Sequence, residues 1–278
     1  RDINSRLVVA FGFILPMWVA PTNIIAGVVL ALWLIQGNYT ADLEKIRRNR
    51  FIWAVLFFVL LNFIGFLWTS DVSNGWEIAG REALLLIIPL FMMVLRREHI
   101  HAAIVAFMAS MTMSTALSLL LWFGINPSFF TYDCPADFSP FMSRISYPPF
   151  LVIAIYISFY RLLLDNKAQI RIKILALITA AAMIFVLFIS NGRAGQAMFF
   201  VMVMLVTFQY QRQHVLRALV ISAIVVPTLA AVAYKTSERF STRLHEAVSD
   251  ISQLEKDKNK ETSVGARLTF ARNSLEIF

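Results

Sequence analysis

The feature that most constrains this chain is a series of long, uninterrupted apolar blocks. Nine blocks follow one another, at residues 7–20, 24–35, 51–68, 83–95, 102–123, 150–164, 174–189, 196–210 and 218–234. Several approach the roughly 20 residues that a helix needs to cross a bilayer. Because their apolar residues run continuously and do not alternate with polar ones, the blocks predict membrane helices and exclude a transmembrane barrel.

The composition agrees, since 59% of the residues are hydrophobic, 15% are charged and the mean hydropathy is +0.69. A soluble chain of this length needs more polar surface. We therefore expect an all-α, polytopic transmembrane helical bundle of about nine spans over residues 1–234, followed by the truncated start of a large, helical periplasmic loop over residues 235–278. The first two blocks are short and adjoin Pro16 and Pro21, so these segments are expected to be tilted, kinked or re-entrant.

Basic residues cluster at alternate ends of the blocks, which is the asymmetry that sets orientation in a membrane. With the N-terminus in the cytoplasm, the dense basic runs are cytoplasmic, at residues 45–50, 96–97, 161–173 and 212–217. The short outer loops then hold only Arg81, Arg144 and Arg193. The segments expected outside are residues 124–149, 190–195 and 235–278. Membrane topology thus explains the net charge of +8, and nucleic acid is not expected as a partner.

Arg193 is the residue that is most suited to binding a ligand. It lies in Ser190-Asn191-Gly192-Arg193-Ala194-Gly195, at the outer end of the seventh block. Small neighbours let a ligand approach the backbone, and a guanidinium binds phosphate through a rigid fork. On position alone, an ordinary interfacial anchor is favoured by about two to one over a diphosphate ligand.

Three further arginines are weaker candidates. Arg267 and Arg272 lie on a predicted outer helix, where a solvated helix face is the alternative. Arg144 precedes the sixth block and either contacts a sugar or phosphate or ends a helix at the interface. His245 lies on an amphipathic helix predicted over residues 238–256 and is assigned to the surface.

Other classes of site are not indicated. The middle of each apolar block lacks Asp, Glu, Lys and Arg, which argues against an ion-driven carrier. The sequence has neither a metal-ligand cluster nor a phosphate-binding glycine loop, so no metal and no other cofactor is expected.

Two motifs resemble those of the O-antigen ligase family, which also includes O-antigen polymerases. The break at residues 190–195 is similar to the family's arginine motif, and Thr262-Ser263-Val264-Gly265-Ala266-Arg267-Leu268 is similar to its second one. The sequence Trp68-Thr69-Ser70-Asp71, at the end of the third block, and the fourth block, which contains Pro89, are also similar to segments of this family, although these features are less specific.

The resemblance implies a metal-independent glycosyltransferase of the bacterial inner membrane, which takes a glycan from undecaprenyl diphosphate at the periplasmic face. A ligase passes the glycan to lipid A–core, and a polymerase passes it to a second carrier-linked glycan. Arg193 and Arg267 would hold the donor diphosphate, with Arg144 and Arg272 as accessory candidates. The family's catalytic histidine follows the second motif, so it is expected beyond Phe278 and the chain is expected to be a fragment.

The sequence leaves ligase and polymerase open, because the two differ in their acceptor. A transporter or flippase is a less favoured alternative, since it predicts charged or broken helices at mid-membrane. A structural scaffold would tolerate Lys or Gln at positions 193 and 267.

Overall fold

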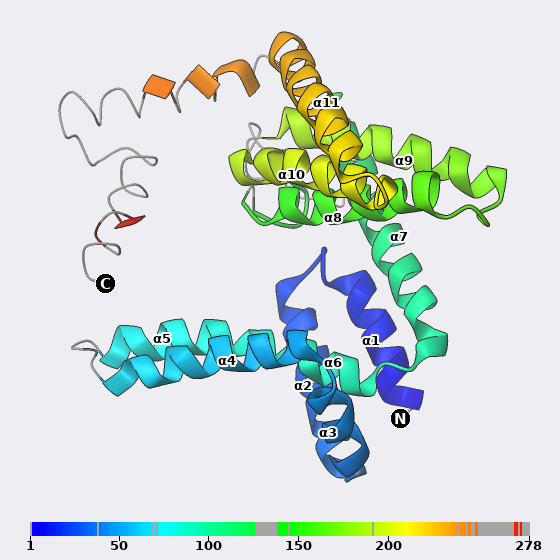
Figure 1. Ribbon diagram of the computed structural model, residues 1–278. Helices are drawn as coiled ribbons and strands as arrows, with labels where there is room; N and C mark the ends of the chain where they lie inside the picture. Colours follow the sequence, from blue (N-terminus) through cyan, green and yellow to red (C-terminus); the bar gives the residue numbers. More distant parts are fainter. Residues whose placement is uncertain are drawn as a thin grey trace. The chain divides into compact units, whose positions relative to one another are not determined.

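The structure is a computed structural model that describes residues 2–37, 39–67, 69, 72–125, 138–143, 145–190 and 192–237, together with 240–242, 244–245, 248–249, 270–271 and 273. Every regular element within these ranges is a helix (Figure 1). The predicted all-α class is therefore confirmed for the described residues. The chain divides into two compact units, residues 1–110 and 111–278, and each is described by itself.

The first unit contains several short helices and the beginning of a long one. They are α1 (Asp2–Ile14), α2 (Val19–Gln36), α3 (Tyr39–Arg47), α4 (Arg50–Ile64), η1 (Gly65–Leu67), α5 (Val72–Ala83), η2 (Leu84–Leu86), α6 (Ile87–Val94) and the first part of α7 (Arg97–Trp122). Val8 of α1, Val29 of α2 and Leu90 of α6 are buried together in its core. The backbone N–H of Arg96 donates to the Ser5 hydroxyl at 3.0 Å, which ties the start of α7 to α1.

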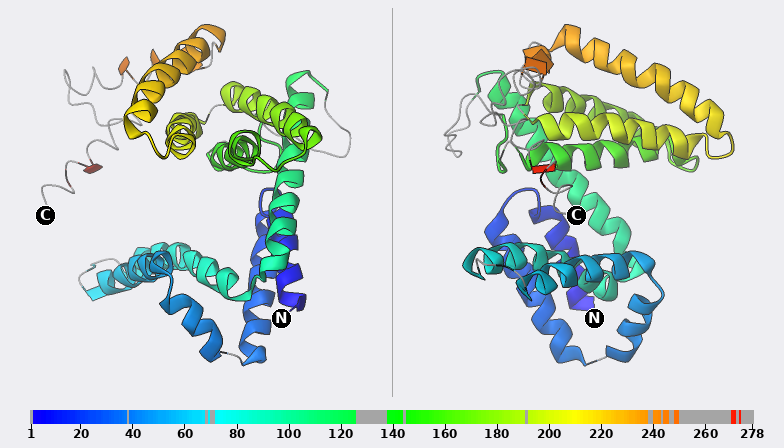
Figure 2. Two further views of the ribbon diagram at one scale, coloured as in Figure 1. Left: turned by 45° about the vertical axis from the view of Figure 1, so that its right-hand side comes forward. Right: turned by 60° about the vertical axis from the view of Figure 1, so that its left-hand side comes forward.

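The region of the fourth apolar block differs from its prediction. Helical structure begins at Val72, eleven residues before the predicted start at residue 83, and α5 lies beside α4 (Figures 1 and 2). Between α5 and α6 the helix changes to the 3₁₀ turn η2, just before Pro89. Proline lacks the N–H that would continue the regular α-helical hydrogen bonds. The apolar pattern did not predict α5, because this helix carries the charged residues Glu77 and Arg81. These two residues form an ion pair on its surface.

The described part of the second unit is helical. It contains the rest of α7, α8 (Tyr147–Phe159), the π-helical turn η3 (Tyr160–Leu164), α9 (Ile170–Ile189), α10 (Arg193–Tyr210) and α11 (Val215–Thr236). Helix α8 packs against both α9 and α10, and α11 lies against α10 (Figure 1). The Tyr156 hydroxyl of α8 donates to the Gln209 amide oxygen of α10 at 3.0 Å.

Among the described residues, four helices are long enough and apolar enough to cross a membrane, namely Arg97–Trp122, Tyr147–Leu164, Ile170–Ile189 and Val215–Thr236. Shorter apolar helices cover Ala20–Gln36, Arg50–Ile64 and Ala194–Tyr210. The outward faces are strongly apolar, since Leu177 and Ile178 of α9 are 57% and 62% exposed. Such surfaces suit lipid as the surrounding solvent. The predicted number of about nine spans stays a prediction, as does the periplasmic loop.

Candidate functional site

The break between α9 and α10 is held by polar side chains that are buried within the second unit. Helix α9 ends at Ile189, and the hydroxyl of the buried Ser190 donates to the Leu187 carbonyl at 2.9 Å. The amide Nε2 of Gln196, also buried, donates to the Ser190 carbonyl at 3.2 Å. These bonds satisfy carbonyls that the end of α9 leaves without helical partners. These bonds therefore join the end of α9 to the first turn of α10.

Helix α10 starts directly against the start of α8. A Cβ atom added to Gly195 would lie 2.9 Å from the carbonyl carbon of Pro148 and 3.0 Å from its Cα atom. These distances are shorter than real Cβ contacts, so only glycine fits at this position. The first turn of α10 is thereby fixed on the first turn of α8.

The start of α8 is in turn fixed on α7. Tyr147 and Ser118 are fully buried, and their hydroxyl oxygens lie 3.1 Å apart. The Ser118 hydroxyl donates to the Ser114 carbonyl at 3.0 Å, so Tyr147 is the donor to Ser118. Trp122 of α7 also meets Phe185 of α9 edge to face, with ring centroids 5.1 Å apart.

The end of α11 lies beside the end of α9. The hydroxyl of Ser237, directly after α11, donates to the Phe188 carbonyl of α9 at 2.9 Å. The Phe188 ring packs edge to face against Phe199 of α10 and against Phe240, at centroid distances of 5.5 and 5.6 Å. The ends of α7, α9 and α11 thus lie with the starts of α8 and α10 at one end of this unit. The sequence predicts that all these ends face outward, an orientation that stays a prediction.

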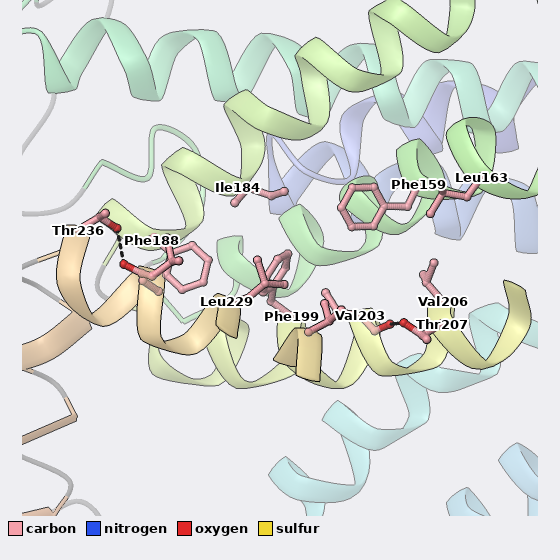
Figure 3. Close-up of a pocket in the computed structure, with 13 residues that line it drawn as sticks. Phe159, Leu163, Ile184, Phe188, Phe199, Val203, Val206, Thr207, Leu229 and Thr236 are labelled. Carbon is pink, nitrogen blue, oxygen red and sulfur yellow. Dashed lines mark hydrogen bonds between the residues drawn. The ribbon is translucent and has the colours of Figure 1, made fainter. Parts of the chain in front are cut away.

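An apolar groove leads to this end of the unit. It has a volume of about 400 Å³ and is shown in Figure 3; its lining residues are Phe159, Leu163, Ile184, Phe188, Phe199, Val203, Val206, Thr207, Val225, Leu229, Val232, Ala233 and Thr236. Both threonine hydroxyls bond to their own helices, Thr207 to the Val203 carbonyl and Thr236 to the Val232 carbonyl, each at 2.8 Å. The groove consequently presents hydrocarbon, and its volume is typical of a ligand pocket.

The groove runs along the helices and ends near the break. Leu163 and Thr207 lie toward one end of it in Figure 3, and Phe188 and Thr236 lie toward the other. Phe199 lies six positions after Arg193 in α10, which corresponds to about 9 Å along the helix axis.

The structure describes part of the predicted site. Arg193 is the first residue of α10, where the helix dipole and free N–H groups favour an anion. Arg144, Arg267 and Arg272 lie outside the described residues. The assignment of diphosphate-binding arginines, including the pairing of Arg193 with Arg267, stays a prediction.

Two features of this end were not found from the sequence. One is the groove, whose residues come from α8, η3, α9, α10 and α11. The other is a contact between the Tyr234 hydroxyl and Nε2 of His245, which lie 2.9 Å apart. His245 is exposed, in agreement with its assignment to the surface. Neither feature has a local signal in the sequence, because each depends on how separate segments pack.

Comparison with known proteins gives one family. Residues 178–278 match the family model described as O-antigen ligase, and neither a curated protein nor a solved structure matches the chain. The matched region contains the last part of α9, the break, α10 and α11, and it includes both arginine motifs. The resemblance seen in those motifs is thereby confirmed. Residues 178–278 of this multi-pass membrane protein are accordingly similar to the O-antigen ligase family.

Proposed function

We propose that this chain belongs to an O-antigen ligase that transfers a glycan from undecaprenyl diphosphate to lipid A–core, at the periplasmic face of the bacterial inner membrane. The family match to residues 178–278 supports a transferase of this kind. The polymerase of the same family uses the same donor and differs in the acceptor, so it is the alternative that the experiment must separate.

The observation that carries the proposal is the position of the apolar groove beside the start of α10. A lipid-linked donor has a long hydrocarbon chain joined to a diphosphate, and it needs an apolar channel that ends at an anion site. The groove supplies the first part through side chains such as Phe199, Val203 and Leu229. The first turn of α10, with Arg193 as its first residue, supports the second part.

The chemistry requires a cation at this point. When the bond between the glycan and the diphosphate breaks, negative charge develops on the leaving diphosphate, and fixed positive groups lower the barrier. Arg193 is proposed as one of these groups and Arg267 as the second, with Arg144 and Arg272 as accessory residues. A histidine is proposed as the general base for the acceptor hydroxyl, as the family resemblance implies.

The test uses the full-length gene in a strain that lacks its own O-antigen ligase, with lipopolysaccharide separated on a gel. The variants are Arg193→Ala, Arg193→Lys and Arg267→Ala, with Lys235→Ala as the control. Lys235 is an exposed cation in the last turn of α11, so this control removes a charge from the same end of the unit. Membrane levels of every variant are measured by immunoblot.

The proposal expects wild type and Lys235→Ala to restore the ladder on lipid A–core, and Arg193→Ala and Arg267→Ala to lose it. The lysine variant should retain only part of the activity, since lysine keeps the charge without the guanidinium fork. Lengthening of chains in a polymerase-deficient strain, without a ladder in the ligase-deficient strain, would replace ligase by polymerase. Full activity of both alanine variants would show that the two arginines do not bind the donor.

A further inference from the structure

The first unit contains a second cavity, which the family match does not cover and the proposed reaction does not use. It has a volume of about 780 Å³ and is lined by Asn49, Ile52, Met92, Met93, Val94, Leu95, Arg96, Arg97 and Ile100. Its apolar wall includes buried side chains, since Ile52 is 1% exposed and Val94 is 7% exposed. Its polar residues come from the start of α4 and the start of α7.

The two arginines of this cavity differ in their electrostatic state. Arg96 is held by two carboxylates, Asp2 at 2.8 Å and Glu98 at 3.0 Å. The hydrogen bond from Arg96 lowers the pKa of Asp2 below its ordinary value, as expected for a carboxylate beside a cation. Arg96 is therefore positioned and largely neutralised. Asp2, Glu98 and His99 could share a metal ion by distance alone, yet Arg96 already occupies the space between the carboxylates.

Arg97 is different. None of the ion pairs within the described part of the chain includes it, and its side chain is exposed. It is the first residue of α7, a helix of 26 residues, so free backbone N–H groups lie next to it. Across the cavity, Asn49 caps α4 and is followed by Arg50, which is exposed. The rim thus has an excess of positive charge beside an apolar wall.

We infer that this cavity binds an anionic phospholipid, with its phosphate at Arg97 and its first acyl carbons against Ile52, Val94 and Ile100. A free phosphate would leave the apolar wall in water, and a zwitterionic lipid would place its own cation beside Arg97. An anionic phospholipid satisfies both parts of the cavity. Basic pockets of this kind bind lipid headgroups on the cytoplasmic side of a membrane, which is the side predicted for residues 45–50 and 96–97.

The experiment measures lipid retention by the purified protein. The protein is reconstituted in nanodiscs of mixed phosphatidylglycerol and phosphatidylcholine, extracted into mild detergent, and analysed by native mass spectrometry for bound lipid. Thermal unfolding in detergent is then followed on adding phosphatidylglycerol, phosphatidylcholine or inorganic phosphate.

Two variants act on the cavity by different means, and one serves as control. Arg97→Gln removes the rim charge, and Ile100→Trp fills the cavity while keeping every charge. Ile100 is 42% exposed, so the larger side chain does not have to enter the core. Arg48→Gln is the control, because Arg48 belongs to the same basic region but pairs with Glu44 at 2.6 Å and does not line the cavity.

The expected result is that wild type and Arg48→Gln retain phosphatidylglycerol and unfold at a higher temperature in its presence. Arg97→Gln should bind it about fivefold more weakly, as expected for one interfacial cation, and Ile100→Trp should not retain it. Three results would overturn the inference: equal weakening by Arg97→Gln and Arg48→Gln, equal stabilisation by phosphatidylcholine, or equal stabilisation by inorganic phosphate. Unfolding of each variant without added lipid shows that the protein is folded. If Arg97→Gln does not fold, Ile100→Trp alone decides.

Discussion

Gly195 lies against Pro148 so closely that a side chain at position 195 would enter the backbone of the neighbouring helix. This contact joins the first turn of α10, which begins at Arg193, to the first turn of α8. The position of the proposed diphosphate-binding residue therefore depends on a contact between two residues that are 47 positions apart in the sequence.

Gly195→Ala should destabilise the second unit by roughly 1–3 kcal/mol, the usual cost of overpacking. Because α10 has to move away from α8, glycan transfer should also fall. Thermal unfolding in detergent and the lipopolysaccharide ladder measure the two effects. Gly80→Ala is the control, since nothing lies within 4 Å of the added Cβ and alanine favours the helix there. Equal stability of Gly195→Ala and wild type would contradict the packing described for this contact.

Tyr147→Phe should lower stability by roughly 0.5–1.5 kcal/mol, because it removes the hydrogen bond to Ser118 and keeps the aromatic ring. Ser118 retains its bond to the Ser114 carbonyl, so the loss is confined to the tyrosine. The melting temperature in detergent is the measurement. Tyr160→Phe changes a side chain that is 47% exposed and should have little effect. If the two variants melt alike, the buried hydroxyl does not stabilise the start of α8.

Ala233→Phe should raise the KM for the lipid-linked donor about tenfold, the effect of losing roughly 1.4 kcal/mol of binding free energy. Ala233 lines the apolar groove and is 7% exposed, so a phenyl group there fills the space assigned to the hydrocarbon chain. Initial rates in proteoliposomes of the full-length protein at varied donor concentration give KM and kcat separately. Ala231→Phe, an exposed position on the same helix outside the groove, is the matched control. An unchanged KM for Ala233→Phe would remove the donor chain from this groove.

Asp165→Asn should lower the melting temperature at pH 7, and the difference from wild type should shrink as the pH falls below 3.8. The hydrogen bond from Arg161, at 2.8 Å, lowers the pKa of Asp165 below its ordinary value of 3.8. A carboxylate with a lowered pKa stabilises the fold above its unfolded pKa, and this contribution is lost as the pH drops through the folded value. Asparagine can still accept the turn bond from the Lys167 N–H.

Melting curves from pH 7 to pH 3 measure this effect. Glu77→Gln is the comparison, because Glu77 and Arg81 form an exposed pair on α5, and exposed pairs contribute little. A difference between wild type and Asp165→Asn that stays constant over this range would show that the charge of Asp165 has no part in stability.

The sequence by itself determined the helical class and most of the helix positions. Polar residues are costly in lipid, so each membrane helix must be apolar along its own stretch of sequence. The apolar blocks therefore predict, within a few residues, the positions of α7, α8 with η3, α9, α10 and α11. The break before Arg193 was also visible, because Ser190, Asn191 and Gly192 interrupt an apolar run. Helix α5 was not predicted, because its charged surface residues interrupt the apolar pattern although the helix packs beside α4.

Only the tertiary structure decided how the candidate site is assembled. The Pro148 contact to Gly195, the Tyr147 bond to Ser118 and the Ser237 bond to the Phe188 carbonyl each join residues far apart in the chain. Hydropathy cannot distinguish an apolar side chain that lines the groove, such as Ala233, from an exposed one on the same helix, such as Ala231. The inside of the groove and the surrounding lipid are both hydrocarbon, so a residue has a similar transfer free energy in each. Which residues line the groove therefore depends on which helix faces pack together.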